Sequence, residues 1–246
     1  MGSKFFDVVR WELEEKLSLP VILFLIFSGI VATLVQPTNN IEPTRNFLNL
    51  YNGSDTFFLF LTFISCALLS HSFAGDLSKG ETKLLLSYPI KRWQLFGSKL
   101  VAMFLTVFFI YGTAYSIHLY LDSLSFLEPM FYLTLFVFSL QLMVVCSITI
   151  VISLFVKNEI MSLLASILLL FGFDNIIGNQ SYISTNGRFM WLFQYFGELT
   201  HEIKPFGENF IVTVDDTIIA ILIPVLIFIV LIAVSYVYFV HIMEVD

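Results

Sequence analysis

Six long apolar runs divide this chain, and they constrain its fold more than any other feature of the sequence. A helix that crosses a membrane needs about 20 consecutive, mostly apolar residues. Only 13% of the residues are charged, against roughly 25% in soluble domains, and the mean hydropathy is +0.88. We therefore predict an all-α membrane protein in which residues 1–246 form a single transmembrane domain. The six predicted spans are residues 18–36, 56–74, 100–121, 130–156, 159–173 and 217–241.

Lysine and arginine are unevenly distributed between the two sides of this predicted domain. If the N-terminus is cytoplasmic, nine of the twelve lie inside, namely Lys4, Arg10, Lys16, Lys79, Lys83, Lys91, Arg92, Lys99 and Lys157. The three outside are Arg45, Arg188 and Lys204. Cytoplasmic segments carry an excess of these residues. We therefore expect a multi-pass protein of the cell membrane with both termini in the cytoplasm.

Residues 4–17, KFFDVVRWELEEKL, have the periodicity of an amphipathic helix. At about 100° per residue, apolar side chains share one face, and they are Phe5, Phe6, Val9, Leu13 and Leu17. Such a helix just before a span can lie along the inner membrane surface with this face among the acyl chains. We predict an interfacial helix, and an ordinary soluble flank is the alternative.

The longest cytoplasmic loop, residues 76–98, joins the second and third spans. Topology alone explains part of its basic charge. Glu81 stands near the start of a short helical pattern that Pro89 ends, because its ring forbids an interior helical hydrogen bond. Leu84, Leu85 and Leu86 are costly in water unless something covers them. We therefore predict a partly apolar helix, flanked by cations, that faces the cytoplasm.

The run GETKLLLSYPIKR at residues 80–92, followed by Gly97-Ser98-Lys99, resembles the signature loop of type-2 ABC transporter permeases. That family also has six spans, an N-terminal interfacial helix and cytoplasmic termini, so the resemblance covers the whole chain. It implies that the loop forms a coupling helix that docks on a separate ATPase subunit. The implied coupling residues are Gly80, Glu81, Thr82, Lys83, Leu84, Leu85, Leu86, Ser87, Pro89, Lys91 and Arg92.

The same resemblance implies the assembly and its work. The chain pairs with a second permease copy or a homologue in the lipid bilayer, and with two ATPases that hold ATP and Mg. This chain itself is then not an enzyme, binds no cofactor and has no nucleic-acid partner. We expect export of an amphipathic, lipid-like, glycan or peptide cargo. A channel or secondary carrier without an ATPase is the main alternative, and a membrane-embedded enzyme is a third.

Motifs for other chemistry are incomplete in this sequence. Gly75 and Gly80 have the spacing of a phosphate-binding loop, but Glu81 replaces the lysine that reaches the phosphates. His71 and His118 are predicted at opposite ends of their spans, so one metal cannot bind both. No His-Glu-x-x-His or Cys-x-x-Cys pattern occurs. We predict no metal site and no catalytic residues.

Small residues at helical spacing indicate where spans pack closely, because lipid removes the hydrophobic drive between helices. Two such pairs are Ser28 with Ala32 and Ser162 with Ser166. In the family that the chain resembles, the first and fifth spans meet across the dimer interface. Contact between permeases and packing within one subunit are both open for these four residues.

The outer segment 174–216 contains RFMWLFQYFGEL, which is dense in aromatic residues but too short to span. We predict a re-entrant or interfacial pair of half-helices at the external end. Irregular backbone at that depth must be buried against protein or water. A loop lying on the outer membrane surface is the alternative.

Overall fold

The computed structural model describes residues 2–16, 62–87, 90–121, 129–177, 185–201 and 211–242. Within these ranges the elements are helices joined by short connections, and no β-strand occurs among them. The predicted all-α class is therefore confirmed. The predicted first span, with Ser28 and Ala32, lies outside the described residues, as do Leu17 and Pro89.

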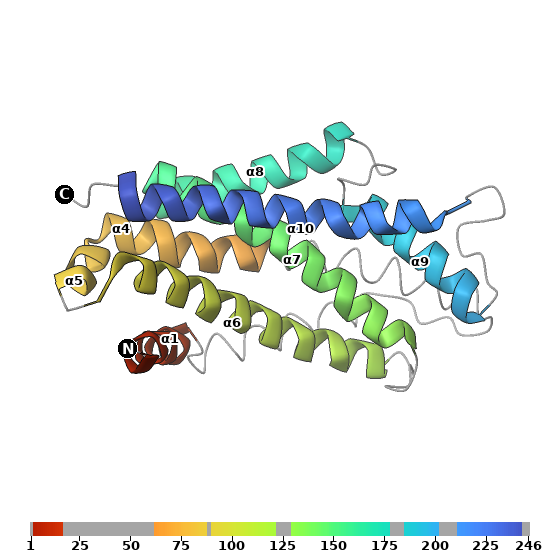
Figure 1. The fold of residues 1–246 in the computed structure, drawn as a ribbon, viewed down its shortest axis with the longest axis horizontal. Helices are drawn as coiled ribbons and strands as arrows, with labels where there is room; N and C mark the ends of the chain where they lie inside the picture. Colours follow the sequence, from red (N-terminus) through yellow and green to blue (C-terminus); the bar gives the residue numbers. More distant parts are fainter. Residues whose placement is uncertain are drawn as a thin grey trace.

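Four long helices form the body of the molecule (Figure 1): α6 (Arg92–Leu121), α7 (Pro129–Val156), α8 (Glu159–Ile177) and α10 (Val214–Val237). Helix α7 contacts α6, α8 and α10. Helix α1 (Gly2–Lys16) packs on α6 and is seen end-on in Figure 1, so it lies crosswise to the long helices. This crosswise direction agrees with the predicted path along a membrane surface.

The chain between the predicted second and third spans consists of short helical pieces. Residues 62–70 are helical and continue into a π-helical turn, η1 (His71–Gly75), and then into α4 (Asp76–Ser78). A two-residue turn leads to α5 (Glu81–Ser87), and α6 begins at Arg92. A second π-helical turn, η2 (Tyr238–Ile242), ends α10. Helix α5, α1 and η2 lie at the same end of the bundle in Figure 1.

Two helical stretches among the described residues are long and apolar enough to cross a membrane, residues 132–156 and 214–242. The apolar stretch Glu159–Gly172 in α8 is shorter. These stretches coincide with parts of the predicted fourth, fifth and sixth spans. The arrangement of six spans and the side on which the termini lie stay predictions.

Local sequence explains where several helices begin and end. Helix α7 ends at Val156 and α8 begins at Glu159, so only Lys157 and Asn158 connect them. The side chain of Asn158 accepts a hydrogen bond from the backbone N–H of Met161 at 3.1 Å, which satisfies a donor of the first turn of α8. The boundary between the predicted fourth and fifth spans lies at this connection.

Helix α10 begins with a reciprocal cap. Asp216 donates its backbone N–H to Thr213 Oγ1 at 3.3 Å, and the backbone N–H of Thr213 donates to Asp216 Oδ2 at 2.9 Å. Two N–H groups that have no partner within the helix are thereby satisfied. The negative charge of Asp216 also suits the positive end of the helix dipole.

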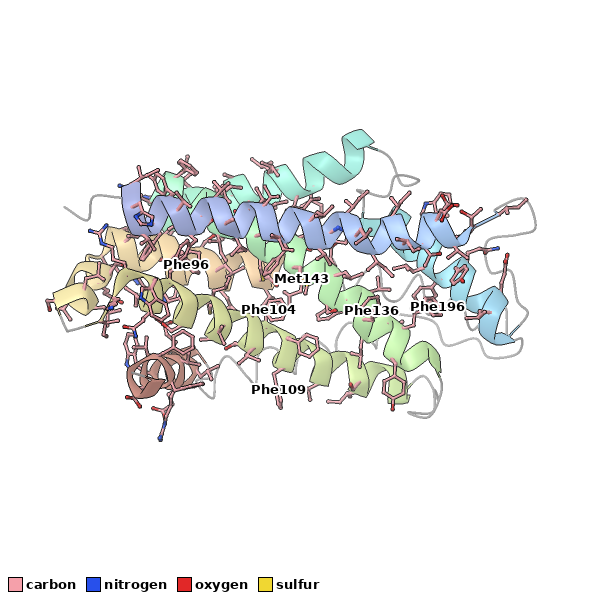
Figure 2. All side chains as sticks on the ribbon, viewed as in Figure 1. Phe96, Phe104, Phe109, Phe136, Met143 and Phe196 are labelled. Carbon is pink, nitrogen blue, oxygen red and sulfur yellow. The ribbon has the colours of Figure 1, made fainter. Side chains whose placement is uncertain are left out.

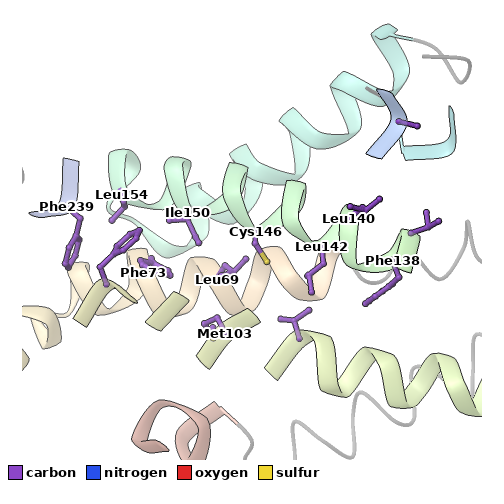
Figure 3. Packing of buried hydrophobic residues seen from close by; sticks show 14 of the residues in the cluster. Leu69, Phe73, Met103, Phe138, Leu140, Leu142, Cys146, Ile150, Leu154 and Phe239 are labelled. Atoms are coloured by element: carbon purple, nitrogen blue, oxygen red, sulfur yellow. The ribbon is translucent and has the colours of Figure 1, made fainter. Parts of the chain in front are cut away.

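The main core joins the helix of residues 62–75 to α6, α7 and η2 (Figure 3). Phe96 of α6 contacts Phe73 of η1 and Phe239 of η2, with ring centroids 5.9 and 5.6 Å apart. Farther along α6, Phe104 lies beside Phe228 of α10, whereas Phe109 is exposed and points away from the bundle (Figure 2). One face of α6 therefore holds the bundle together, whereas Phe109 lies on an exposed face of the same helix.

The outer segment contains one described helix, α9 (Thr185–His201), which packs on α7 and α10. Leu192, Phe193 and Gln194 of this helix are fully buried. Helix α8 also extends to Ile177, past the predicted end of the fifth span. Among the described residues, the segment is thus a helix packed on the bundle rather than a loop spread on a surface, and the predicted pair of half-helices stays a prediction.

Candidate functional site

We call residues 76–99 the coupling segment. It turns sharply between α4 and α5. Gly80 has a φ of 76°, which is the left-handed region that glycine adopts at little cost. The backbone N–H of Lys79 donates to Gly75 O at 2.9 Å, and that of Leu84 donates to Gly80 O at 3.2 Å. These bonds close α4 and open α5, and the left-handed backbone of Gly80 sets the direction in which α5 leaves the bundle.

Helix α5 has one buried face and one open face. Thr82 is buried, and Leu85 and Leu86 are half-buried against the main core. Leu84 is 63% exposed, and Glu81 is exposed beside it. The chain therefore covers two of the three consecutive leucines itself, and a single leucine is presented outward.

The corner after α5 is formed by the start of α6. The backbone N–H of Lys91 donates to the side chain of Gln94 at 3.1 Å, which caps the first turn of α6. Lys91 is exposed, Arg92 is half-buried and Trp93 is largely exposed. Pro89 and the side chain of Lys83 are outside the described part of the chain. The role of Pro89 in this corner stays a prediction.

A buried ion cluster closes the base of the coupling segment. Lys99 of α6 donates its Nζ to Glu12 Oε1 of α1 at 2.6 Å and also to Asp76 Oδ2 of α4. The backbone carbonyl of Ser72 in η1 lies 3.4 Å from the same Nζ. The side chains of Lys99 and Glu12 are 2% and 0% exposed, and that of Asp76 is also buried. One lysine thus joins α1, the π-helical turn, α4 and α6.

The electrostatics of the cluster keep its lysine charged. Burial lowers the pKa of Lys99, but the adjacent carboxylates of Glu12 and Asp76 raise it by more, so its pKa is above the ordinary lysine value. A buried charge is tolerated when it is paired and hydrogen-bonded. Removing one member leaves uncompensated charge in a buried site, which is strongly destabilising. The three charges therefore depend on one another.

Helix α1 has less free apolar surface than its sequence predicts. Phe6 is 69% exposed, Phe5 and Leu13 are half-buried, and Val9 is buried. A Cβ atom at Gly97 of α6 would lie 3.4 Å from Phe5 Cε2, so the two helices approach closely at this glycine. Part of the predicted membrane face of α1 is therefore a contact with α6, and Phe6 is the member that lies open among those the structure describes.

The predicted small-residue pair Ser162 and Ser166 lies in a buried polar seam of this chain. The hydroxyl of Ser162 is 3.1 Å from that of Ser70 and 2.7 Å from that of Ser153. Ser166 donates to the backbone carbonyl of Ser162 at 2.7 Å. Both serines are fully buried. Ser162 thus links α8 to α7 and to the helix of residues 62–70 within one chain, and a contact of this pair with a second permease stays a prediction.

A second polar link connects the π-helical turn to α8. Nδ1 of His71 lies 2.9 Å from Oε1 of Glu159, and about two-fifths of each side chain is exposed. His71 therefore contacts a carboxylate at the start of α8. Among the described residues, no group of three or more His, Cys, Asp and Glu side chains is arranged to hold a metal ion.

Sequence reasoning did not find the cluster of Glu12, Asp76 and Lys99. It placed Lys99 among the cytoplasmic cations and in the family motif, and it gave Glu12 and Asp76 no role. One signal was present, because Glu12 shares a helical face with Val9, about one turn away, and with Phe5, about two turns away. A carboxylate on an apolar face indicates a buried partner, but the sequence does not say which cation meets it.

The fold and this segment define a class, an all-helical membrane protein with a short helix anchored at one end of the bundle. The family model described as ABC-2 family transporter protein matches residues 16–173, which is more than half of the chain. The chain belongs to this family and is a permease subunit of an ABC transporter. The matched region includes α4 and α5, and it extends through most of α8. No curated protein matches the chain.

Proposed function

We propose that this chain is the membrane-spanning permease of an ATP-driven exporter and that α5 is the helix on which a separate ATPase docks. The exposed side of α5 carries the argument. Leu84 is turned outward, whereas Thr82, Leu85 and Leu86 face the bundle. An isolated exposed leucine needs no explanation by itself. Here, however, it stands on a helix that packs on α4 and lies at the same end of the bundle as α1 and η2.

Exposed charged residues stand on both sides of this leucine in the sequence. Lys79 and Glu81 precede it, and Lys91 follows it at the corner that leads into α6. All three residues are exposed. A small apolar anchor within a polar rim is typical of protein interfaces. In the proposed assembly, ATP draws two ATPases together, and their approach pushes α5 and rocks two permease copies against each other.

The remaining parts of the proposal concern the assembly and its cargo. We place the chain in the cell membrane, with six spans and both termini in the cytoplasm. The apolar, aromatic composition favours an amphipathic cargo, either lipid-like, a glycan or a peptide, that is released outward. ATP and Mg bind to the partner ATPase, and a second permease copy or a homologue completes the pathway.

Affinity capture tests the docking surface. The tagged permease is co-expressed with the ABC-type ATPase that the proposal predicts in the neighbouring open reading frame, and it is captured in detergent. We expect Leu84→Glu to lower the amount of ATPase captured, because a carboxylate would be buried in an apolar contact. Leu199→Glu is the matched control, since Leu199 is 66% exposed on α9 at the other end of the bundle.

The outcomes separate the candidate functions. Equal capture by wild type and Leu84→Glu would contradict docking on α5. Transport by purified wild-type chain with no ATPase bound would instead favour a channel or a secondary carrier. Loss of capture in both variants would point to a general loss of folding rather than to the docking surface.

A further inference from the structure

The ion cluster stands where the coupling segment begins and ends. Asp76 is the first residue of α4, and Lys99 lies in the second turn of α6, 23 residues later. Helix α5 lies between them. The contact between Asp76 and Lys99 thus connects α4 to the start of α6, the two stems that flank α5 in the sequence.

The same lysine also reaches outside the loop. Its contact with Glu12 spans 87 residues of sequence and connects the stems to α1. Apolar packing independently holds α1 on α6, because Val8 is buried in the main core and Phe5 lies against Gly97. The cluster extends this attachment from α6 to α4, so α1 is joined to both ends of the coupling segment.

The burial of the charges makes these connections stiff. An ion pair in water separates at little cost, because water solvates both partners. Lys99, Glu12 and Asp76 have almost no contact with solvent. Moving α1 away from α4 would therefore leave charges without partners in a medium of low dielectric constant.

We propose that Lys99 is a positioning residue that joins α1 and the coupling segment, residues 76–99, into one rigid unit. This inference rests on the proposed function, since it concerns how a push by the ATPase on α5 spreads through the permease. The push then moves α1, α4, α5 and the start of α6 together. Without the lysine, α5 still docks, but its movement is not passed fully to α1.

Distances between spin labels test this unit in the reconstituted complex. One pair, Phe6→Cys with Ser78→Cys, reports within the unit, because both residues are exposed and lie on α1 and α4. A second pair, Phe6→Cys with Leu199→Cys, reports between the unit and the far end of the bundle. The native Cys66 and Cys146 are buried, so labelling is directed to the introduced thiols.

We expect the first distance to stay narrow and unchanged between the nucleotide-free and ATP-trapped complexes, while the second distance shifts. In Lys99→Met, we expect the ATPase to be captured as in wild type and the first distance to broaden or shift on ATP. Lys99→Arg, which keeps the charge, should restore the narrow distribution. A role in folding alone would lower the yield without this dependence on nucleotide.

Several results would overturn the inference. A change in the first distance on ATP in the wild type would show that α1 and α4 move separately, whatever the variants do. An unchanged distribution in Lys99→Met with ATPase bound would leave the proposed function intact and remove the role of Lys99. If wild type captures no ATPase, or if neither distance responds to ATP, both proposals fail.

Should Lys99→Met not fold, the triple variant Glu12→Gln, Asp76→Asn, Lys99→Met replaces it, because it removes all three buried charges together. This variant keeps the shapes of the side chains while weakening the links. An unchanged first distance in the triple variant on ATP would likewise overturn the inference.

Discussion

Replacing Lys99 by methionine should be among the most destabilising substitutions in this bundle. The change keeps the approximate length of the side chain, but the carboxylates of Glu12 and Asp76 lose the ammonium that they contact. Breaking a buried ion pair by removing one partner costs about 3–5 kcal/mol. That is a large share of a typical stability of about 5–15 kcal/mol.

The expected loss can be read as a thermal shift. For chains of about this size, 1 kcal/mol corresponds to roughly 2–4 °C in the midpoint, so Lys99→Met should melt roughly 6–20 °C below wild type. The assay heats the detergent-purified permease to a series of temperatures and measures the folded fraction left at each temperature by size-exclusion chromatography. The triple variant Glu12→Gln, Asp76→Asn, Lys99→Met is the control, because replacing all the charges is often neutral or stabilising.

The pattern across these two variants tests the reasoning. A single variant that melts close to wild type would show that the carboxylates accept protons or water at little cost. A triple variant that melts as low as the single one would assign the loss to the shape of Lys99 rather than to charge. In either case the electrostatic account of the cluster would be refuted.

Three further measurements test other parts of the structure. Gly80→Ala should lower stability by about 1–2 kcal/mol, because Gly80 has a positive φ. Gly112 in α6 has open space around the position of a Cβ, so Gly112→Ala should be neutral or stabilising. Ser162→Ala should lower stability by about 1–3 kcal/mol, because it leaves the buried hydroxyls of Ser70 and Ser153 without this partner. Ser139→Ala loses only a hydrogen bond within its own helix and should lower stability less. Because the pKa of Lys99 is raised in the folded state, its stabilisation is complete below about pH 10.4, the ordinary lysine pKa, and is lost at higher pH. The gap in melting temperature between wild type and Lys99→Met should accordingly shrink as the pH rises above about pH 10.4. A gap that widens there would contradict the electrostatic argument. Equal losses in the two glycine variants, or in the two serine variants, would contradict the arguments for those residues.

The helices were predictable because their signals are local. Apolar periodicity indicated α1, the lengths of the apolar runs indicated the long helices, and the break between the fourth and fifth runs marked the turn between α7 and α8. Glu81 and the following leucines indicated α5. Each of these predictions needs only the chemistry of neighbouring residues, which a single sequence contains.

The ion cluster was not predictable in the same way, because it joins residues that are 23 and 87 positions apart. The sequence suggests that Glu12 is buried, but several lysines are candidates for its partner. The burial of Leu85 and Leu86 in α5 was not predictable for the same reason. They pack against the main core, and they face it only because of the direction that α4 and Gly80 give to α5.

The π-helical turn His71–Gly75 lies between two sets of polar links. On one side, Ser70 joins the buried seam with Ser162 of α8, and His71 contacts Glu159 of the same helix. On the other side, Asp76 contacts Lys99 and is thereby joined to α1. π-helical turns frequently occur at functional sites. Under the proposed function, a push on α5 therefore reaches this turn through α4 and is divided there, with one part carried to α8 and the other to α1 and α6.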